Sequence, residues 1–426
     1  MGISIKNFRA ILLAAILTGA AATACTITSL PTSTPSISAT TPPEAASTAI
    51  QAQPTTAVPA TSSPTPDLEA TQAALATPTE EPFHLPGGRL LIGALTGPQE
   101  GRDLVPDGWW SKYFWLSLPD GAVEPYPALS GEYPIRDRTV ALSPDYSHLA
   151  FVRQTFAGDE SLIPQSTIIY LLEPDNKGPV QIAPPVAKGA GIKGITWSLD
   201  SRFVAFWDAE EWQYGGDEKN MHIYDVQSGV LKSLSVKAFS PGDPELSPNG
   251  DRVAFANEDL NPDTAGLYLI NADGTDEHRL VEGAIFSPKW HPDGGRLFFE
   301  QADLKVDPET GFRHIYSYDL ASRVITLLTP ADQSSYWFVL SPDGRSLTYI
   351  SEQEGAIRLS VVDTDGGAPV ELTRGSGIGT ENIWSPDSQY LAYFESGAIY
   401  IMDSQGRGQV QVYNDPNGAD LIAWLP

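Results

Sequence analysis

A short turn motif recurs six times between residues 142 and 390 of this 426-residue chain. Each copy follows an apolar residue, reads Ser-Pro-Asp or a close variant, and leads into a stretch rich in aromatic and aliphatic residues. The copies begin at Ser143, Ser198, Ser247, His291, Ser341 and Ser385. The spacings between these residues are 55, 49, 44, 50 and 44. Periods of about 40–50 residues are typical of β-propellers and solenoids, so this repeat constrains the fold more than any single motif.

Within each period the pattern predicts four short antiparallel strands. Pro presets φ in the first turn, and Asp accepts a hydrogen bond from the backbone two residues on. Third strands such as MHIYDVQSG and GLYLINADG close on an Asp, Asn or Gly turn into a short fourth strand. Residues 86–426 show no helical periodicity of comparable length. The sequence therefore predicts an all-β ring of four-stranded blades, a β-propeller, over 86–426.

The two ends of this region complete the count. Residues 421–426 match only the first strand of a repeat, and residues 86–93 match the second. We expect one blade to combine both ends, which closes the ring and removes free sheet edges. Six internal repeats and this shared blade make seven blades of about 49 residues each. A six-bladed ring with irregular ends is the alternative.

The Ser-Pro-Asp-Gly turns, followed by an Ala-Phe-type strand and an Ile-Tyr-x-x-Asp strand, resemble the WD-like repeats of TolB-type β-propellers. Similar repeats form the propeller domains of tricorn-type and dipeptidyl-peptidase-type proteases. The resemblance covers almost all of 86–426, and its departures (Leu199, Asn249 and His291 for Pro, Asp and Ser) concern turn quality. It implies functions that range from periplasmic scaffolds to gating domains of peptidases and some lyases. Function must therefore be argued from a site.

The first residues read as an export signal. Lys6 and Arg9 precede an apolar stretch at 10–24 that ends at Cys25. The stretch is shorter than the ~20 strongly apolar residues that a membrane span needs. Residues 22–25, Ala-Thr-Ala-Cys, resemble a bacterial lipobox, in which the Cys is diacylated and becomes the mature N-terminus. We expect a lipoprotein signal peptide at 1–24 and lipidation at Cys25. Ordinary cleavage, which would give a secreted protein, is the alternative.

A tether follows the signal. Thr, Ser, Pro and Ala make up 42 of the 60 residues at 26–85, and Lys and Arg are absent there. Such a composition buries too little apolar area to offset its ordering entropy. We expect residues 25–85 to form a disordered linker between membrane and propeller.

Composition excludes several kinds of site. The net charge of -27 argues against nucleic acid, which requires clustered Lys and Arg. A single Cys excludes an internal disulfide and Cys-based metal clusters. A Gly-x-Ser-x-Gly nucleophile elbow is absent, which argues against a self-contained peptidase. We assign no catalytic residue.

Metal sites find little support in the sequence. Five histidines lie in the repeat region, two of them in first turns of different blades and two at the start of third strands, and we read them as turn and strand-edge residues rather than as ligands of a metal such as manganese. They are His148, His222, His278, His291 and His314. Asp-rich turns at 271–274 and 363–366 lack the EF-hand continuation, so they read as turn formers. We assign no metal site and no cofactor, and binding of Ca²⁺ is left as an open alternative.

Charge is distributed unevenly over the two faces of the expected ring. Loops between second and third strands and loops between blades share one face, here called the loop face. The Ser-Pro-Asp turns lie on the other, here called the turn face. The seven second-to-third loops are predicted at 96–110, 155–166, 207–220, 257–265, 300–313, 351–355 and 395–397. These 72 residues carry 20 of the 48 acidic but only 4 of the 24 basic residues of 86–426. A solubilising rim and an acidic binding surface both fit this enrichment.

Aromatic residues accompany these acids. Acid-flanked Trp and Tyr suit sugar stacking or cation–π recognition, whereas loops folded onto the rim are the competing interpretation. The candidate ligand-binding residues are Trp109, Trp110, Trp212, Tyr214, Tyr336, Trp337, Asp208, Glu210, Glu211 and Asp217. Trp197, Trp290, Trp384 and Trp424 precede turns in first strands, so we expect them in the core.

Three functions remain open from the sequence. The first is a lipid-anchored, extracytoplasmic, monomeric propeller of the bacterial envelope that binds an envelope protein, peptide or glycan through the loop face. The second is a polysaccharide lyase or glycoside hydrolase of propeller fold. The third is a structural component of an envelope complex. In all three, the only contact with a membrane is the lipid.

Overall fold

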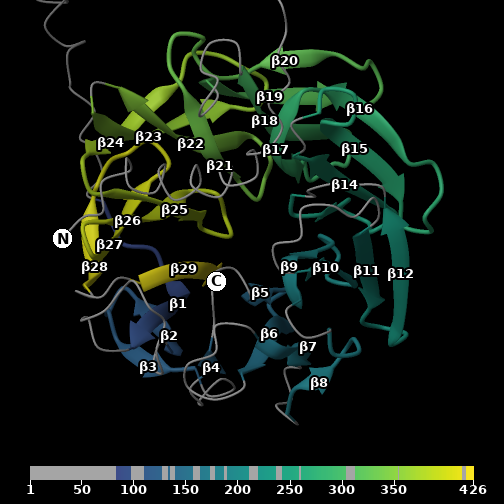
Figure 1. The fold of residues 1–426 in the computed structure, drawn as a ribbon. Coiled ribbons are helices and arrows are strands. Elements are labelled where there is room, and N and C mark those ends of the chain that lie inside the picture. Colours follow the sequence, from purple (N-terminus) through teal and green to yellow (C-terminus); the bar gives the residue numbers. More distant parts are fainter. Residues whose placement is uncertain are drawn as a thin grey trace, which may run out of the picture. The chain divides into compact units, whose positions relative to one another are not determined.

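Seven antiparallel β-sheets follow one another around a common axis (Figure 1). The computed structural model describes residues 83–96, 110–126, 133–134, 140–156, 164–172, 178–186, 190–210, 219–236, 242–258, 261–303, 312–353, 355–414 and 419–426. The compact unit runs from Phe83 to Pro426. The prediction of a seven-bladed propeller is therefore confirmed, and the six-bladed alternative is wrong.

Each blade is named here by its place along the chain. Blade 1 consists of β29 (Ala419–Leu425), β1 (Gly88–Thr96), β2 (Trp110–Leu118) and β3 (Val123–Pro125), with β4 (Tyr133–Pro134) also paired to β2. Blade 2 consists of β5 (Val140–Leu142), β6 (Leu149–Phe156), β7 (Pro164–Leu172) and β8 (Val180–Gln181). Blade 3 consists of β9 (Ala190–Trp197), β10 (Phe203–Glu210), β11 (Lys219–Asp225) and β12 (Val230–Val236).

The remaining blades repeat the same order from the axis outward. Blade 4 consists of β13 (Glu245–Leu246), β14 (Arg252–Asn257), β15 (Gly266–Asn271) and β16 (His278–Glu282). Blade 5 consists of β17 (Ala284–Trp290), β18 (Arg296–Asp303), β19 (Phe312–Asp319) and β20 (Ile325–Leu327). Blade 6 consists of β21 (Ser335–Leu340), β22 (Ser346–Gln353), β23 (Ala356–Asp363) and β24 (Val370–Gly375). Blade 7 consists of β25 (Ile378–Trp384), β26 (Tyr390–Glu395), β27 (Ala398–Asp403) and β28 (Val410–Asn414). Among the described residues, no helix is long and apolar enough to cross a bilayer.

The shared blade closes the ring as the sequence predicts. β29 pairs antiparallel with β1, from Arg89 opposite Leu425 to Ala94 opposite Ala419. Gly88 allows the two ends to approach, because its φ is +106° and a Cβ there would lie 2.3 Å from the Leu425 carbonyl oxygen. Closure covers the edge that β1 would otherwise expose.

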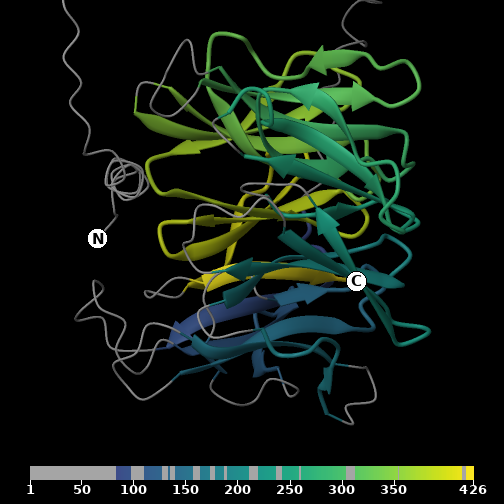
Figure 2. The same cartoon turned by 45° about the vertical axis from the view of Figure 1, so that its right-hand side comes forward.

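The hydrophobic core is divided among the junctions between blades. Buried apolar residues form seven clusters, and each cluster joins two neighbouring blades. Alternation along the strands produces this arrangement, since Phe298 packs toward blade 6 and Phe299 toward blade 4. Figure 2 shows the sheets of successive blades lying one beside the next. Each blade is therefore stabilised chiefly by its two neighbours.

Large and small core residues alternate at the end of the innermost strands. The last position before the turn is Leu142, Trp197, Leu246, Trp290, Leu340 and Trp384 in blades 2–7, and Trp424 in blade 1. The expectation of a core location holds for Trp290, Trp384 and Trp424, which are 3–6% exposed, and Trp197 is partly buried. Three of these indoles donate to a carbonyl of the preceding blade: Trp197 to Ala141, Trp290 to Glu245 and Trp384 to Val339, at 3.0–3.2 Å.

The turn serine organises both its own turn and the junction to the next blade. Ser143 Oγ donates to Asp145 Oδ1 at 2.7 Å and accepts from the His148 N–H at 2.8 Å. The Asp145 N–H donates to Ser201 Oγ of blade 3 at 2.9 Å. Burial would raise the pKa of Asp145, but hydrogen bonds from Ser143, Ser147 and Ser201 lower it to about 2. The carboxylate therefore stays ionised and the turn stays capped at neutral pH.

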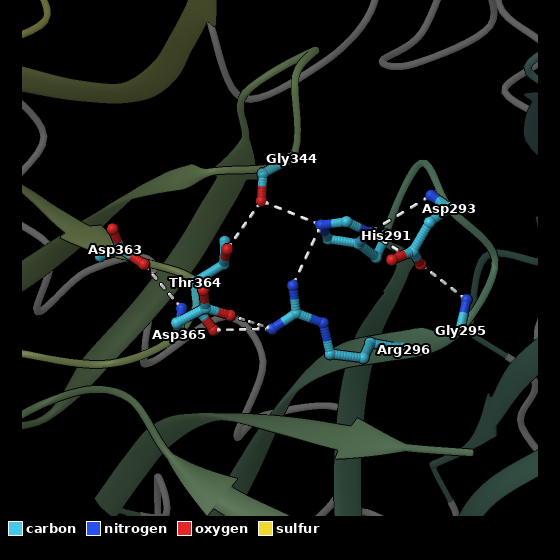
Figure 3. Close-up of polar contacts among 8 residues, drawn as sticks. All are labelled: His291, Asp293, Gly295, Arg296, Gly344, Asp363, Thr364 and Asp365. Carbon is cyan, nitrogen blue, oxygen red and sulfur yellow. Dashed lines mark hydrogen bonds and ion pairs between the residues drawn. The ribbon is translucent and has the colours of Figure 1, made fainter. Parts of the chain in front are cut away.

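In blade 5 a histidine replaces this serine and reaches further. His291 Nδ1 accepts the Asp293 N–H at 3.2 Å, and His291 Nε2 lies 3.1 Å from the Gly344 carbonyl oxygen of blade 6 (Figure 3). Arg296 adds a second link, because its Nη1 donates to Asp365 Oδ1 of blade 6 at 2.7 Å. His291 therefore contacts both its own turn and the neighbouring blade, whereas a serine in its place would be shorter.

Candidate functional site

Five of the ten predicted loop-face residues lie outside the described part of the chain. These are Trp109, Trp212, Tyr214, Glu211 and Asp217, and Cys25 also lies outside it. Trp110 begins β2 and Glu210 ends β10, and the structure describes only the backbone of these two residues. The structure describes the side chains of Asp208, Tyr336 and Trp337.

Tyr336 and Trp337 form an aromatic pair at the loop-face end of β21. Their ring centroids are 4.8 Å apart with planes at 88°, an edge-to-face arrangement. Both side chains pack against the cluster between blades 6 and 7 and keep part of their surface exposed. The predicted pair is therefore partly folded onto the rim and partly accessible.

Trp337 occupies a bulge in the innermost strand with a left-handed backbone. Its φ is +53°, and the β21–β22 register shifts beside it. The corresponding residues are Gly194 (φ +62°) in β9 and Ser287 (φ +49°) in β17. This conformation costs a bulky residue about 1–3 kcal/mol, so neighbouring contacts must hold it.

A buried carboxylate holds the bulge. Glu300 is 0% exposed, and its Oε1 accepts the Trp337 N–H at 2.7 Å. Its Oε2 accepts from Arg313 Nη1 at 3.1 Å, and the Arg313 guanidinium lies 4.0 Å from the Phe286 ring centroid. Counted from the turn, the same position in the other internal blades is apolar: Val152, Trp207, Ala256, Ile350 and Phe394. The Glu300 carboxyl group in this register links blade 5 to the aromatic pair of blade 6.

Sequence reasoning placed Glu300 and Trp207 in loops, and this was wrong. β18 continues to Asp303 and β10 to Glu210, so both residues lie within strands, and both are buried. An alignment of the six repeats by their turn serines would have singled out Glu300, because that register is otherwise apolar. Asp208, one of the four acids predicted as ligand-binding residues, also lies in β10, and its Oδ1 is 3.0 Å from His222 Nε2.

Three polar side chains meet along the innermost strands of blades 3, 4 and 5. Glu245 Oε2 accepts from Lys289 Nζ at 2.8 Å and from Thr196 Oγ1 at 3.3 Å. Each of the three residues stands one position before the Trp or Leu that ends its strand. The ion pair is partly exposed, so it contributes about 0–1 kcal/mol and chiefly orders this part of the inner ring.

A shallow groove of about 550 Å³ lies between blades 3 and 4 on the turn face. Phe203 and Ile223 are among its apolar residues, and Asp225, Asp251 and Asp273 are among its acids. Hydrogen bonds lower the pKa of all three acids; that of Asp225 falls to about 2, chiefly through Arg202. All three are therefore ionised at neutral pH. The groove combines residues from three separate turns, which no single sequence motif could indicate.

Metal ligands do not converge in the described ranges. Within them, no group of three or more His, Cys, Asp or Glu side chains is placed to hold a metal ion. In the Asp-rich turns, Asp273 Oδ1 accepts the Thr275 N–H and Asp363 Oδ1 accepts the Asp365 N–H, at 2.8–2.9 Å. These carboxylates act as turn caps.

No family model matches the chain. It is 33% identical over 210 residues to the uncharacterized protein Atu1656 of Agrobacterium fabrum, which covers 47% of this chain and 62% of that protein. Among solved structures, the β-propeller domain of the trilobed protease from Pyrococcus furiosus matches 77% of this chain and all of that domain, with 14% identity and a TM-score of 0.55. TolB from Acinetobacter baumannii matches 76% of this chain and 81% of its own, with 18% identity and a TM-score of 0.44.

The likeness is one of fold. At 14% identity, the match to the protease domain supports the propeller architecture and leaves substrate and partner open. The chain spans 18–62% of the length of three curated relatives that it matches. What those longer proteins do is therefore not carried over to this chain.

Proposed function

We propose that this protein is a lipid-anchored, extracytoplasmic binding propeller of the bacterial cell envelope. Its loop face takes a protein or peptide segment that carries lysine or arginine, and glycans are the competing ligands. The observation that carries the proposal is the Tyr336–Trp337 pair, which is partly exposed and is held in a costly backbone conformation by Glu300. A fixed aromatic pair loses little entropy when a ligand binds.

Charge supports a cationic partner. The residue ranges predicted as the loops of this face carry 20 of the propeller's 48 acidic residues and 4 of its 24 basic ones, and one of the 20, Glu300, is buried in β18. Acidic surfaces accelerate the approach of cations, and aromatic faces attract ammonium and guanidinium groups by about 0.5–2 kcal/mol. An acidic loop face around a fixed aromatic pair therefore favours Lys- or Arg-bearing segments over neutral ones.

Trp337→Gly should weaken this binding without unfolding the ring. Gly adopts the left-handed backbone without strain and already occupies the matching bulge as Gly194, so only the indole is lost. With the full chain on a sensor surface and arrays of Lys/Arg-rich and neutral decapeptides as probes, we expect selective capture of the cationic peptides. The variant should bind them about tenfold more weakly, as the loss of about 1–2 kcal/mol predicts.

The control for this experiment lies on the opposite face. Leu199 is 50% exposed in a Ser-Pro-Asp-type turn, so Leu199→Ala removes a surface apolar group of the turn face and should leave binding unchanged. Equal affinities of Trp337→Gly and wild type would reject the aromatic pair as the binding surface. If the protein binds to a glycan array and shows no preference among the peptides, its ligand is a sugar and not a cationic peptide segment.

Lipidation at Cys25 has a test of its own. Two acyl chains anchor a protein stably, whereas an unmodified chain has no such attachment. Cys25→Ser should therefore move the protein from the membrane fraction to the soluble fraction or the medium when it is expressed in a bacterial host. Thr26→Ser is the matched control and should stay with membranes. Retention of Cys25→Ser in the membrane fraction would refute the anchor.

A further inference from the structure

Blade 3 differs from its neighbours in one repeated aromatic pair. In blades 2, 4, 5 and 7 an aromatic ring of the second strand stacks on a tyrosine of the third strand, with centroids 5.4–5.9 Å apart. The pairs are Phe151–Tyr170, Phe255–Tyr268, Phe299–Tyr316 and Tyr393–Tyr400. In blade 3 the partner of Phe206 is His222, at 5.1 Å. An imidazole therefore stands where other blades carry a phenol.

This histidine lies between a carboxylate and a hydroxyl. His222 Nε2 is 3.0 Å from Asp208 Oδ1, and His222 Nδ1 is 2.8 Å from Ser233 Oγ. The three residues come from the adjacent strands β10, β11 and β12 (Figure 1). Strand register places them together, since His222 is opposite Phe206 on one side and Ser233 on the other.

The contacts fix the tautomer of His222. An ionised carboxylate only accepts hydrogen bonds, so Nε2 carries the proton that faces Asp208. The lone pair of Nδ1 then accepts the Ser233 hydroxyl. A hydroxyl on the lone pair of an imidazole whose other nitrogen is bound to a carboxylate is activated as a nucleophile, and here the two ring nitrogens exchange the roles they have in the serine-protease triad, so that Nδ1 is the base.

The neighbouring positions leave the hydroxyl accessible. Ser233 is exposed, and the side chains of His222 and Asp208 are 12% and 27% exposed. At the register position of Ser233 the other internal blades carry longer side chains: Gln181, Arg279, Leu327, Glu371 and Gln411. Asn220 lies two residues from His222 on the same face of β11 and is exposed, so an amide N–H donor stands beside the site.

We propose that Ser233 is a base-activated nucleophile and that this edge of blade 3 transfers acyl groups from small esters. Ser233 Oγ bonds to the ester carbonyl carbon while its proton passes to His222 Nδ1, and Asp208 stabilises the imidazolium. The Asn220 amide donates to the carbonyl oxygen as it becomes negative. His222 then returns the proton to the departing alkoxide as the ester C–O bond breaks. His222 Nδ1 then deprotonates a water, and the hydroxide bonds to the acyl carbon. The bond between that carbon and Ser233 Oγ breaks, Oγ takes the proton back from His222, and the acid leaves.

A fluorophosphonate probe tests the nucleophile directly, because Oγ attack on phosphorus expels fluoride and leaves a stable adduct. With the full chain, peptide mass spectrometry should find the adduct on Ser233, and Ser233→Ala should abolish it. His222→Tyr installs the residue of four other blades against Phe206, so it keeps the stacked pair and removes the base. Labelling and hydrolysis of p-nitrophenyl acetate should both fall about 100-fold or more. Asp208→Asn should lower both by about tenfold or more, since the amide lacks the charge that stabilises the imidazolium.

Ser235→Ala is the matched control, because Ser235 lies two residues along β12 on the same face. It should leave the labelling of Ser233 unchanged. An unlabelled Ser233 in the wild-type chain would overturn the proposal. So would equal labelling rates in the wild type and in folded His222→Tyr, since the three residues would then form only a structural hydrogen-bond chain.

Discussion

Deletion of residues 419–426 should abolish the cooperative unfolding of the propeller. β29 supplies the innermost strand of blade 1, and without it the inner edge of β1 loses its partner. Leu90, Leu91 and Ile92 of β1 are all 0% exposed in the closed ring, and the deletion would expose that strand to solvent. An exposed apolar edge strand promotes association between chains. In urea titrations followed by tryptophan fluorescence we expect no single transition, and in size-exclusion chromatography we expect aggregates.

Trp424→Leu tests the contribution of the largest side chain of β29 separately from that of the strand itself. Leu stands at this position in blades 2, 4 and 6, so the variant keeps β29 and loses only indole packing from a residue that is 3% exposed. It should unfold cooperatively with a free energy of unfolding lower by about 1–3 kcal/mol. If the deletion variant unfolds at the same urea concentration as the full chain, the closure by β29 does not stabilise the ring.

Replacement of Glu300 by alanine should cost about 2–4 kcal/mol of folding free energy. The change leaves a cavity, an unpaired N–H at Trp337 and an Arg313 guanidinium without its counter-ion. Removal of one partner from a buried ion pair is strongly destabilising, and the 27% exposure of Arg313 moderates the penalty. The free energy of unfolding from urea titration measures the effect.

Glu300→Gln is the matched variant. Its amide oxygen still accepts one hydrogen bond and its volume is unchanged, so its loss of stability should be about half that of Glu300→Ala or less. Glu300→Ala should also weaken the binding of cationic peptides, because it releases the bulge that orients Trp337. A Glu300→Ala variant as stable as the wild type would show that Glu300 does not hold the two blades together.

The architecture could be predicted from the sequence because each repeat carries its own turn motif. A turn such as 143–148 marks where one strand ends and the next begins, and six copies fix both the blade and the period. The contact of His222 with Asp208 and Ser233 depends on strand register within blade 3, and that of Glu300 with Trp337 depends also on how blades 5 and 6 pack together. A slip of one residue turns every side chain of a strand to the opposite face, so those contacts required the folded sheet.

The sequence also predicted the ends of some strands incorrectly. The sequence placed residues 300–313 in one loop, yet β18 and β19 extend into that range from both sides. In the sequence, a charged residue near the end of a strand looks like a loop residue. An acid that is buried beside a partner on another strand leaves no sign of that partner among its sequence neighbours. Glu300 illustrates this, since its partner Arg313 is thirteen positions away and opposite Ala302.

The alternation of Leu and Trp in the innermost strands gives the ring a unit larger than one blade. The indole hydrogen bonds join blade 3 to 2, blade 5 to 4 and blade 7 to 6, so the chain consists of three two-blade modules and one closing blade. Because seven is odd, this alternation cannot run unbroken around the ring. Trp384 of blade 7 and Trp424 of blade 1 stand at equivalent positions of neighbouring blades, and each packs toward the blade before it in the ring. The other six junctions each combine one Leu with one Trp, so the junction at which β29 closes the ring differs from them in its innermost residues.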